Sequence, residues 1–339
     1  MSKAVSRLPH AHATPRRKMA PATAAVVLIG LFGFAPSLPA QSAGDLTPLQ
    51  VNRDVLVEMA ALGSIAAPRQ GSPPYRVSPD GRVRAVPGTG SITYNVRVGD
   101  SAIRMRGDHL EPAVSITTDP AGEQRGLNTL AQIGNTARVV SGDARGATGK
   151  VVGKHGGIEN VMIEFPDAVL EQLVIGDRIQ IRTVGLGMLA ENANDVAIRN
   201  MSPTLLDAMN ANGMGVQANG RLLVPVTHRV PAKIMGSGLG ANQVHTGDYD
   251  IQLFDEGVVA QYGLNTLRLG DIVAIIDADH THGRTFLTGA VSIGVVVHGG
   301  SHVAGHGPGV TTLLTSAKGN IDLEINPDMN LANLLNLQR

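Results

Sequence analysis

The segment IVAIIDADHTHGRTFLTGAVSIGVVVH, from Ile272 to His298, contains two apolar runs separated by a polar turn. The first run ends at Ile276, HTHG reverses the chain, and the second run returns towards His298. Short apolar runs bounded by turn residues are typical of buried strands. The segment therefore predicts a β-hairpin in the core, and it sets the strand-rich class of the whole fold.

The composition supports a strand-rich core. Hydrophobic residues make up 43% of the 339 residues, but aromatic residues only 3%, and tryptophan is absent. The core must therefore be built from Val, Ile, Leu, Met and Ala. Glycine accounts for 41 of the 339 residues, a share well above the usual ~7%, and so many glycines favour tight turns. We expect a β-rich α+β protein of two domains, built from short strands and hairpins with a few short helices.

Further elements can be placed along the chain. The alternating ITYNVRV (residues 92–98) predicts a half-buried strand, and residues 148–183 predict a small curled sheet or barrel. Short helices are expected at residues 126–135, 165–174, 202–209 and 330–338, the third with Ser202 as its N-cap. A polar stretch near residues 190–200 suggests an N-terminal β-rich domain at 45–195 and a C-terminal α+β domain at 196–339.

Three Gly-Asp pairs each precede a β-rich run, with the aspartates at Asp100, Asp177 and Asp271. The simplest interpretation is a tight turn that leads into a strand. Glycine supplies the turn dihedral, and the aspartate accepts hydrogen bonds from the turn backbone.

The N-terminus resembles an export signal. Arg16, Arg17 and Lys18 precede an apolar run that ends in SLPAQSA, so we interpret residues 1–40 as a signal peptide cleaved after Ala40. The paired arginines leave the twin-arginine route open beside the general secretory one, and an uncleaved anchor is the alternative. We expect a periplasmic or secreted protein without a membrane span after cleavage, since no second apolar run of that length follows.

Several function classes are excluded or disfavoured. The chain has no cysteine, which excludes thiolate catalysis and cysteine-ligated metals. Basic and acidic residues number 28 each, so no basic field gathers nucleic acid, and few aromatics could stack bases. We expect no nucleic-acid partner.

The turn of the predicted hairpin carries two acids and two imidazoles in DADHTHGR. Strand alternation would place Asp277 and Asp279 side by side, about 6–7 Å apart. Two carboxylates that close repel unless a cation or a proton separates them, which suggests a divalent metal site. An exposed turn made of ordinary turn residues is the alternative.

A second candidate is VVVHGGSHVAGHGPGVTT, residues 295–312, with His298, His302 and His306 four residues apart. The many glycines forbid a helix, so this is a glycine-rich loop that leaves a buried strand. His298 or His306 could act as a general acid or base. Backbone amides of two glycine-rich loops could hold the substrate or an oxyanion; the candidate residues are Gly236, Gly238, Gly240, Gly307 and Gly309.

Two further segments offer metal ligands. GDHLEP carries Asp108, His109 and Glu111, and GDYD carries Asp248 and Asp250. Together with the hairpin turn, they give a candidate metal set of Asp277, Asp279, His109 and Asp248, in which Asp279 is also a candidate catalytic residue.

Geometry limits how these groups can combine. His282 and His298 are 16 residues apart, and a straight strand would separate them by ~50 Å. A common site needs a break in the strand, for which Gly289 or Gly294 could supply a bulge.

The segments ITYNVRVGD, GDHLEPAVSI, GDIVAI and above all SIGVVVHGGSHVAGHGPGVTTLLT resemble a bacterial and archaeal family of domains of unknown function, number 4438. The resemblance covers about Asn52 to Ile325 and implies an N-terminal and a C-terminal domain. The family has no agreed activity, so the resemblance implies a fold and not a reaction. The signal segment departs from the family pattern.

From the residues we expect an exported, metal-assisted hydrolase of a small, amide-like substrate. A non-catalytic periplasmic binding or scaffold protein and a metal-free lyase or isomerase are the alternatives. Long apolar strands such as VSIGVVV also suggest a homo-oligomer.

Overall fold

The protein is described by a computed structural model that covers residues 46–71 and 73–338. The predicted signal peptide lies outside the described residues. Within the described ranges, no helix is long and apolar enough to cross a membrane.

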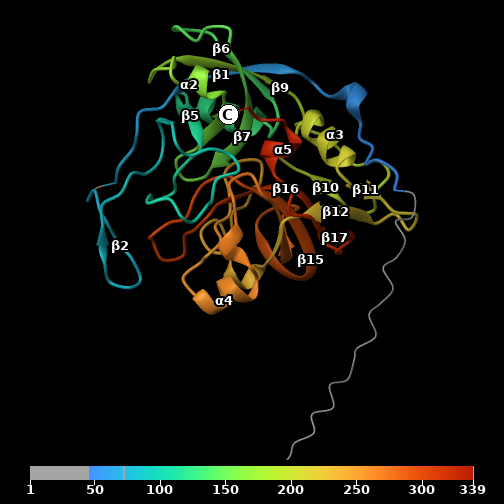
Figure 1. Ribbon diagram of the computed structural model, residues 1–339. Coiled ribbons are helices and arrows are strands. Elements are labelled where there is room, and N and C mark those ends of the chain that lie inside the picture. Colours follow the sequence, from blue (N-terminus) through green and yellow to red (C-terminus); the bar gives the residue numbers. More distant parts are fainter. Residues whose placement is uncertain (1–45, 72, 339) are drawn as a thin grey trace, which may run out of the picture. The chain divides into compact units, whose positions relative to one another are not determined.

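Seven antiparallel strands of the N-terminal half form the first sheet (Figure 1), in the order β1-β9-β6-β7-β8-β5-β4. Because β1 also pairs with β5, six of these strands close into a ring, and β4 is attached at β5. A small curled sheet or barrel is predicted for residues 148–183; that segment supplies β7, β8 and β9 of the ring, and β1, β5 and β6 come from residues 59–139. The strands are β1 (Met59–Ile65), β4 (Ile92–Thr93), β5 (Ala113–Thr117), β6 (Thr136–Val139), β7 (Thr148–His155), β8 (Asn160–Glu164) and β9 (Arg178–Thr183).

The C-terminal half forms a five-stranded sheet in the order β10-β16-β15-β14-β13. The predicted hairpin is confirmed: β14 and β15 are antiparallel, with Ile272 opposite Val295. Only the pairing of β13 with β14 is parallel among the described strands of this sheet. The strands are β10 (Ala197–Ile198), β13 (His228–Pro231), β14 (Ile272–Asp279), β15 (Thr285–Val296) and β16 (Val310–Ser316).

A bulge bends this hairpin. The register shifts between Ile276 and Ala278, where Asp277 adopts φ 65° and Gly289 adopts φ 85°. The Asp277 carboxylate accepts a hydrogen bond from the Gly289 amide at 2.8 Å, which closes the bulge. Beyond it, the His280 amide donates to Thr315 Oγ1 of β16 at 3.0 Å. The end of β14 therefore curls across β15. A break is predicted at Gly289 or Gly294, and the strand register shifts beside both, the second shift being between Ile293 and Gly294 in the β15–β16 pairing.

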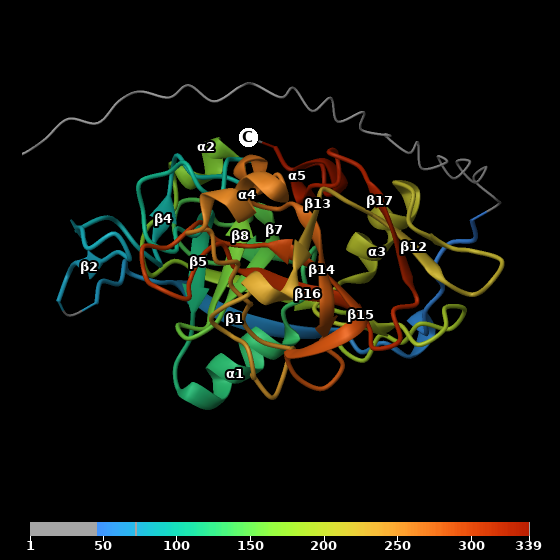
Figure 2. The same cartoon turned by 90° about the horizontal axis from the view of Figure 1, so that it is seen from below.

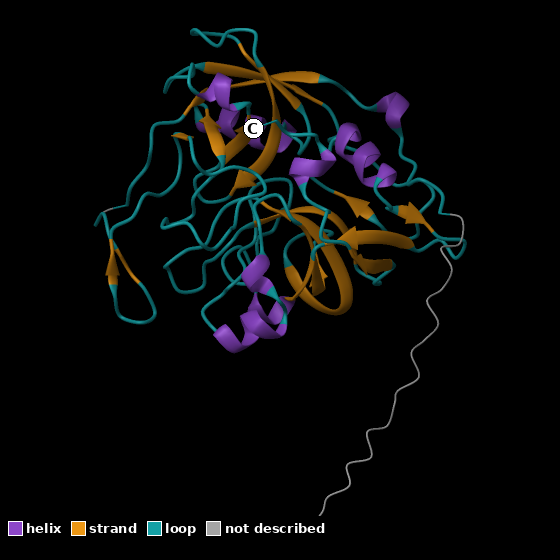
Figure 3. Ribbon diagram, in the orientation of Figure 1, coloured by secondary structure: helices purple, strands orange, loops and turns teal. Residues whose placement is uncertain are grey.

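The remaining elements are short and lie around the sheets (Figure 3). Ser202 caps its helix as predicted, since its side chain accepts a hydrogen bond from the Leu205 amide. Helix α1 begins five residues before the predicted start at residue 126. The helices are α1 (Ala121–Leu130), α2 (Asp167–Leu170), α3 (Pro203–Ala211), α4 (Glu256–Gln261) and α5 (Leu331–Leu334), with 3₁₀ turns at η1 (Arg53–Val55), η2 (Ala232–Ile234) and η3 (Leu264–Thr266). The other strands are β2 (Arg76–Val77), β3 (Val83–Arg84), β11 (Gly215–Val216), β12 (Leu222–Val226) and β17 (Ile321–Ile325).

The prediction of a strand at residues 92–98 is wrong in length, because within that range only Ile92–Thr93 forms a strand. The chain then turns so that Arg97 is buried, where its guanidinium forms an ion pair with Glu164 and donates to the Phe165 carbonyl. An alternating pattern cannot distinguish a strand from an extended segment whose charged residue is paired inside the protein.

The three Gly-Asp pairs are turns, as predicted. Gly99, Gly176 and Gly270 all have positive φ. In each turn the aspartate side chain accepts a hydrogen bond from the amide three residues earlier; the acceptors are Asp100, Asp177 and Asp271.

The core joins the two sheets. One aliphatic cluster contains Ile163 of β8 and Ile293 of β15. Strands β7 and β16 lie side by side (Figure 2). Thr311 Oγ1 of β16 donates to the Lys154 carbonyl of β7. The β-rich α+β class of two domains is confirmed. The predicted boundary near residue 195 falls between β9 and β10 and stays a prediction. Contact between β7 and β16 positions the end of β7 beside the loop that follows β15.

Candidate functional site

Two histidines meet where β7 and β15 end. His155 is the last residue of β7, and His298 follows β15 by two residues; their rings stack with centroids 4.0 Å apart. Asp248 joins them, with its Oδ2 atom 2.6 Å from His298 Nε2 and its Oδ1 atom accepting the Gly156 amide at 2.6 Å. We call His155, Asp248 and His298 the inner triad. All three are buried, and their donor atoms lie within 4.8 Å of one another.

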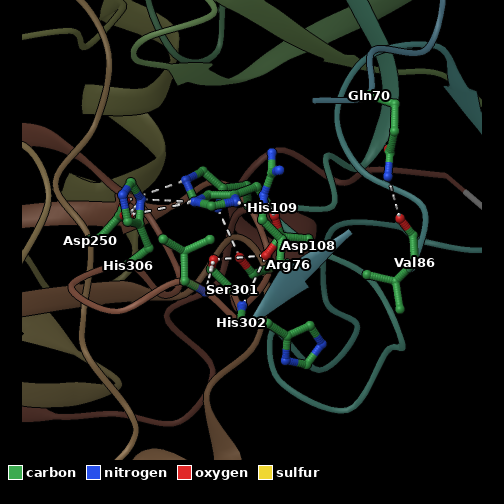
Figure 4. Close-up of polar contacts among 12 residues, drawn as sticks. Gln70, Arg76, Val86, Asp108, His109, Asp250, Ser301, His302 and His306 are labelled. Atoms are coloured by element: carbon green, nitrogen blue, oxygen red, sulfur yellow. Dashed lines mark hydrogen bonds and ion pairs between the residues drawn. The ribbon is translucent and has the colours of Figure 1, made fainter. Parts of the chain in front are cut away.

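A second group lies beside the first. We call His109, Asp250 and His306 the outer triad, and its donor atoms also lie within 4.8 Å of one another. Asp250 Oδ2 is 3.0 Å from His306 Nδ1 and 3.8 Å from His109 Nε2 (Figure 4). Its other oxygen, Oδ1, is 3.6 Å from His298 Nε2 of the inner triad. The Asp250 carboxylate therefore lies between the two triads.

Three of the four histidines hold one ring nitrogen away from the centre. The Nδ1 atom of His155 lies 2.6 Å from a Glu111 oxygen, that of His298 lies 2.9 Å from the Gly299 carbonyl, and that of His109 lies 3.2 Å from Asp108. Each Nδ1 that carries a proton can donate it to these oxygens. The Nε2 atom then faces the cluster of the two triads, where it donates to a carboxylate when protonated and offers its lone pair when deprotonated. Partners of this kind orient the histidine ligands of metal ions in proteins.

Glu111 is itself held by hydrogen bonds. It accepts from Ser115 Oγ at 2.5 Å, from Asn160 Nδ2 at 2.9 Å and from the Gly90 amide at 2.7 Å. Burial alone would raise its pKa, but the hydrogen bonds from His155, Ser115 and Asn160 outweigh burial and lower the pKa to about 2. Glu111 therefore stays ionised and keeps the His155 ring in one orientation.

Asp250 is ionised for the same reason. Burial opposes ionisation of Asp250, but hydrogen bonds with His109, His298 and His306 hold its pKa well below the usual range. For His298, burial opposes the charged form, but the nearby Asp248 and Asp250 carboxylates outweigh it and raise the pKa. The cluster thus holds negative charge that needs protons or a cation close by.

Gly309 leaves room for the inner triad. A Cβ atom at this position would lie 1.8 Å from Asp248 Oδ2 and 2.2 Å from His298 Nε2. No side chain fits there without moving both Asp248 and His298. The absence of a side chain at Gly309 therefore allows the glycine-rich loop to pack directly against Asp248 and His298.

A cavity of about 890 Å³ opens onto the site. This volume is in the range of ~300–1,000 Å³ that is usual for small-molecule pockets. His155, Asp248 and the whole outer triad line the cavity, and His298 does not. A small molecule in the cavity would thus contact the outer triad directly.

The structure brings together some of the predicted residues and separates others. His109, Asp248, His298 and His306 lie in the triads. His302 does not, because its ring points away from His109 and His306 while its amide donates to Asp108 (Figure 4).

The placement of Asp277 and Asp279 requires a correction. Asp277 closes the β-bulge, and Asp279 accepts hydrogen bonds from the amide and hydroxyl of Thr281. Neither aspartate belongs to the triads or lines the cavity. Because the bulge interrupts the strand at Asp277, the two carboxylates no longer point to the same face of β14. The Asp279 side chain instead contacts Thr281 in the hairpin loop.

The predicted glycines also have other contacts. The amides of Gly236 and Gly240 donate to the carbonyls of Asp250 and Arg284, so they are not free for an oxyanion. A Cβ at Gly307 would lie 1.7 Å from the Ile251 carbonyl oxygen, so this residue permits close packing of two segments. Among the five glycines predicted to bind substrate, Gly238 is the one that lines the cavity.

His280, from the turn quoted above, lies behind the site and is fully buried. Its Nδ1 atom is 2.7 Å from Thr312 Oγ1, and its Nε2 atom has no hydrogen-bond partner within the described ranges. Burial, together with the charge of Arg284, lowers its pKa to about 3. His280 is therefore neutral in the folded protein over most of the acidic range.

A pH dependence of stability follows from His280. Between pH 6.5 and about 3, the unfolded chain binds a proton at this ring that the folded protein does not bind. Stability should therefore fall as the pH falls, by about 1.4 kcal/mol per pH unit from this residue. Urea unfolding of the wild type and of His280→Gln at pH 6 and pH 4 should show that the variant loses about 2 kcal/mol less. Parallel losses in the two proteins would contradict the assignment.

Sequence reasoning missed His155. It noted Glu111 and Asp250 among the acids that could serve a metal site but did not include them in the candidate metal set. A recognisable pattern was nevertheless present: His-Gly-Gly follows an apolar strand twice, at His155 and at His298. The two histidines of this repeated tripeptide are the two whose rings stack in the inner triad.

The fold and the site define a β-rich α+β protein with a histidine–aspartate centre open to a cavity. The N-terminal model of the domain of unknown function DUF4438 matches residues 75–207, and its C-terminal model matches residues 213–335. The chain belongs to this family. It is also similar to the crystal structure of TM1086, with 42% identity, a TM-score of 0.79 and coverage of 84% of this chain and 98% of that one. No curated protein matches the chain.

Proposed function

We propose that the protein is a divalent-cation-dependent hydrolase of a small, amide-like substrate. The observation that supports the proposal most directly is the orientation of the histidines. Glu111, Asp108 and a backbone carbonyl each hold a histidine by Nδ1, which leaves Nε2 to face the buried Asp248 and Asp250 carboxylates. Such carboxylate–histidine pairs are typical of metal sites.

The donor set suits a borderline divalent ion. Imidazole nitrogens and carboxylate oxygens bind zinc, manganese, iron or cobalt, and the chain has no cysteine that would select a softer metal. His155, Asp248 and His298 would hold one ion, and His109, Asp250 and His306 a second. Asp250, whose oxygens face both groups, would bridge them, as carboxylates do in two-metal hydrolases.

The chemistry would take place at the outer triad, because it lines the cavity. A divalent cation polarises a substrate carbonyl and lowers the pKa of a water molecule that it binds. His298 suits a ligand better than a general acid or base, since it is fully buried and does not line the cavity. His306, whose side chain is 35% exposed, would likewise serve as a ligand, at the side of the outer triad that is open to the cavity. An ion-bound water molecule, rather than either imidazole, would then supply the base.

Metal titration of the chelator-treated protein tests the proposal. We expect isothermal titration calorimetry to show binding of zinc or manganese with a stoichiometry that approaches two. His306→Ala should lose the weaker of the two sites. His282→Ala is the matched control, because His282 is exposed on the hairpin turn and belongs to neither triad. Hydrolysis of an amide panel should then require the added ion.

Other outcomes would contradict the proposal. If neither ions nor chelator change the melting temperature while small ligands raise it, the binding-protein alternative is supported. If turnover proceeds in chelator, a metal-free lyase or isomerase mechanism is supported. Export and homo-oligomerisation stay predictions from the sequence.

A further inference from the structure

Arg284 is a buried cation at the wall of the cavity. It follows the turn between β14 and β15, is 4% exposed and lines the cavity with Asp248 and Asp250. Its Nη2 atom donates to the Thr246 carbonyl at 3.0 Å, and its Nε atom has no hydrogen-bond partner within the described part of the chain. A buried N–H group without a partner is costly, so this side chain offers a donor that a ligand could satisfy.

The backbone holds Arg284 in position. Its amide donates to the Ala241 carbonyl, and its carbonyl accepts from the Gly240 amide, both at 2.9 Å. Gly238 brings the same loop against it, since a Cβ there would lie 3.5 Å from Nη1 of Arg284. The glycine-rich loop at residues 236–241 therefore serves to fix a guanidinium group at the cavity. Such a built position distinguishes Arg284 from a mobile surface arginine.

Further arginines line the same cavity, namely Arg69, Arg76 and Arg84. Arg76 lies beside Asp108, with 3.7 Å between Nε and Oδ2 (Figure 4), and Arg69 is exposed. The cavity is thus lined by imidazoles, carboxylates and guanidinium groups, and Arg284 lies near Asp248 and Asp250. A neutral substrate would make little use of these cations.

We infer that the substrate is a small organic anion, with a carboxylate or phosphate group bound by Arg284 and its reacting bond at the outer triad. This inference rests on the proposed function for the position of the reacting bond. The planar guanidinium matches both kinds of anion, because its N–H groups form a fork that binds two oxygens together. A cavity of about 890 Å³ admits a molecule of this size.

Calorimetry with simple anions tests this inference without a known substrate. Glutarate and inorganic phosphate are titrated into metal-free protein, beside glutaramide as the neutral counterpart of glutarate. We expect the wild type to bind one of the anions and not glutaramide; the anion that binds more tightly identifies the charged group. Arg284→Gln should weaken the anion at least tenfold, and Arg69→Gln, at an exposed position, should weaken it about two- to fivefold.

Controls separate this inference from the proposed hydrolase. Arg145→Gln, an exposed arginine outside the cavity lining, should bind the anion as the wild type does. Circular dichroism shows whether Arg284→Gln is folded; Arg69→Gln supplies the readout if it is not. If the wild type binds the anion but no metal, and Arg284→Gln loses anion binding, the hydrolase proposal fails and the anion site stands. Equal anion affinity in wild type and both cavity variants, no anion binding to wild type, or equal affinity for glutaramide would overturn the inference.

Discussion

Asp250→Asn is expected to weaken divalent-ion binding at least about 100-fold at both triads. Replacement of an outer partner of a metal ligand typically costs 10- to 100-fold, so a residue that faces both ions should reach or exceed the upper end of that range. The amide has nearly the same shape as the carboxylate but no charge, and one of its two oxygen positions becomes an NH₂ group. Competition with a chromophoric chelator measures the loss.

Two matched variants make the result specific. Asp108→Asn removes the partner that orients His109 and should have the smaller effect of an outer partner. Asp279→Asn changes a carboxylate outside both triads and should leave the affinity unchanged. If Asp250→Asn and Asp279→Asn bind the ions equally well, Asp250 does not bridge two ions.

Gly309→Ala is expected to destabilise the fold by about 3 kcal/mol or more, at the upper end of the cost of overpacking. The added methyl group would lie 1.8 Å from an oxygen of Asp248 and 2.2 Å from His298 Nε2, so both must move. Because these two residues belong to the inner triad, the ion affinity of that triad should fall together with the stability. Urea unfolding and metal titration of the same sample measure both effects.

Gly305→Ala is the control within the same loop. Gly305 has φ 81°, and a Cβ there would have no neighbour within 4 Å, so this variant should show only the backbone cost of about 1–2 kcal/mol. Its ion affinity should stay close to that of the wild type. If Gly309→Ala bound ions with wild-type affinity, the ion affinity of the inner triad would not depend on the close contact of Gly309 with Asp248 and His298.

The local parts of the fold could be predicted from the sequence. The hairpin at β14 and β15, the cap at Ser202 and the Gly-Asp turns depend on neighbouring residues and short spacing, so sequence patterns report them directly. The strand expected at residues 92–98 failed because burial of Arg97 depends on Glu164, a distant residue. Closure of the barrel needs the pairing of β1 with β5, and no local sequence pattern predicts that pairing.

The candidate site could be predicted only in part, for a related reason. His298, His306, His109 and Asp248 attracted interest because acids and imidazoles cluster in short segments. His155 stands alone in a barrel strand, and tertiary contacts, such as the one between β7 and β16, bring it to His298. Asp277 and Asp279 showed the densest local pattern, yet the bulge gives them a local backbone role. Clusters of acids and histidines in the sequence therefore predicted which residue types form the site, but not which individual residues lie together.

The donors of the inner triad come from both halves of the chain. His155 belongs to the barrel, inside the region matched by the N-terminal family model, whereas Asp248 and His298 belong to the region matched by the C-terminal one. Neither half carries all three residues of the inner triad, so one half alone would lack this centre. Selection on the centre would therefore act on both halves together. Recombination between distant relatives would preserve the centre only where His155 from one half still meets Asp248 and His298 from the other.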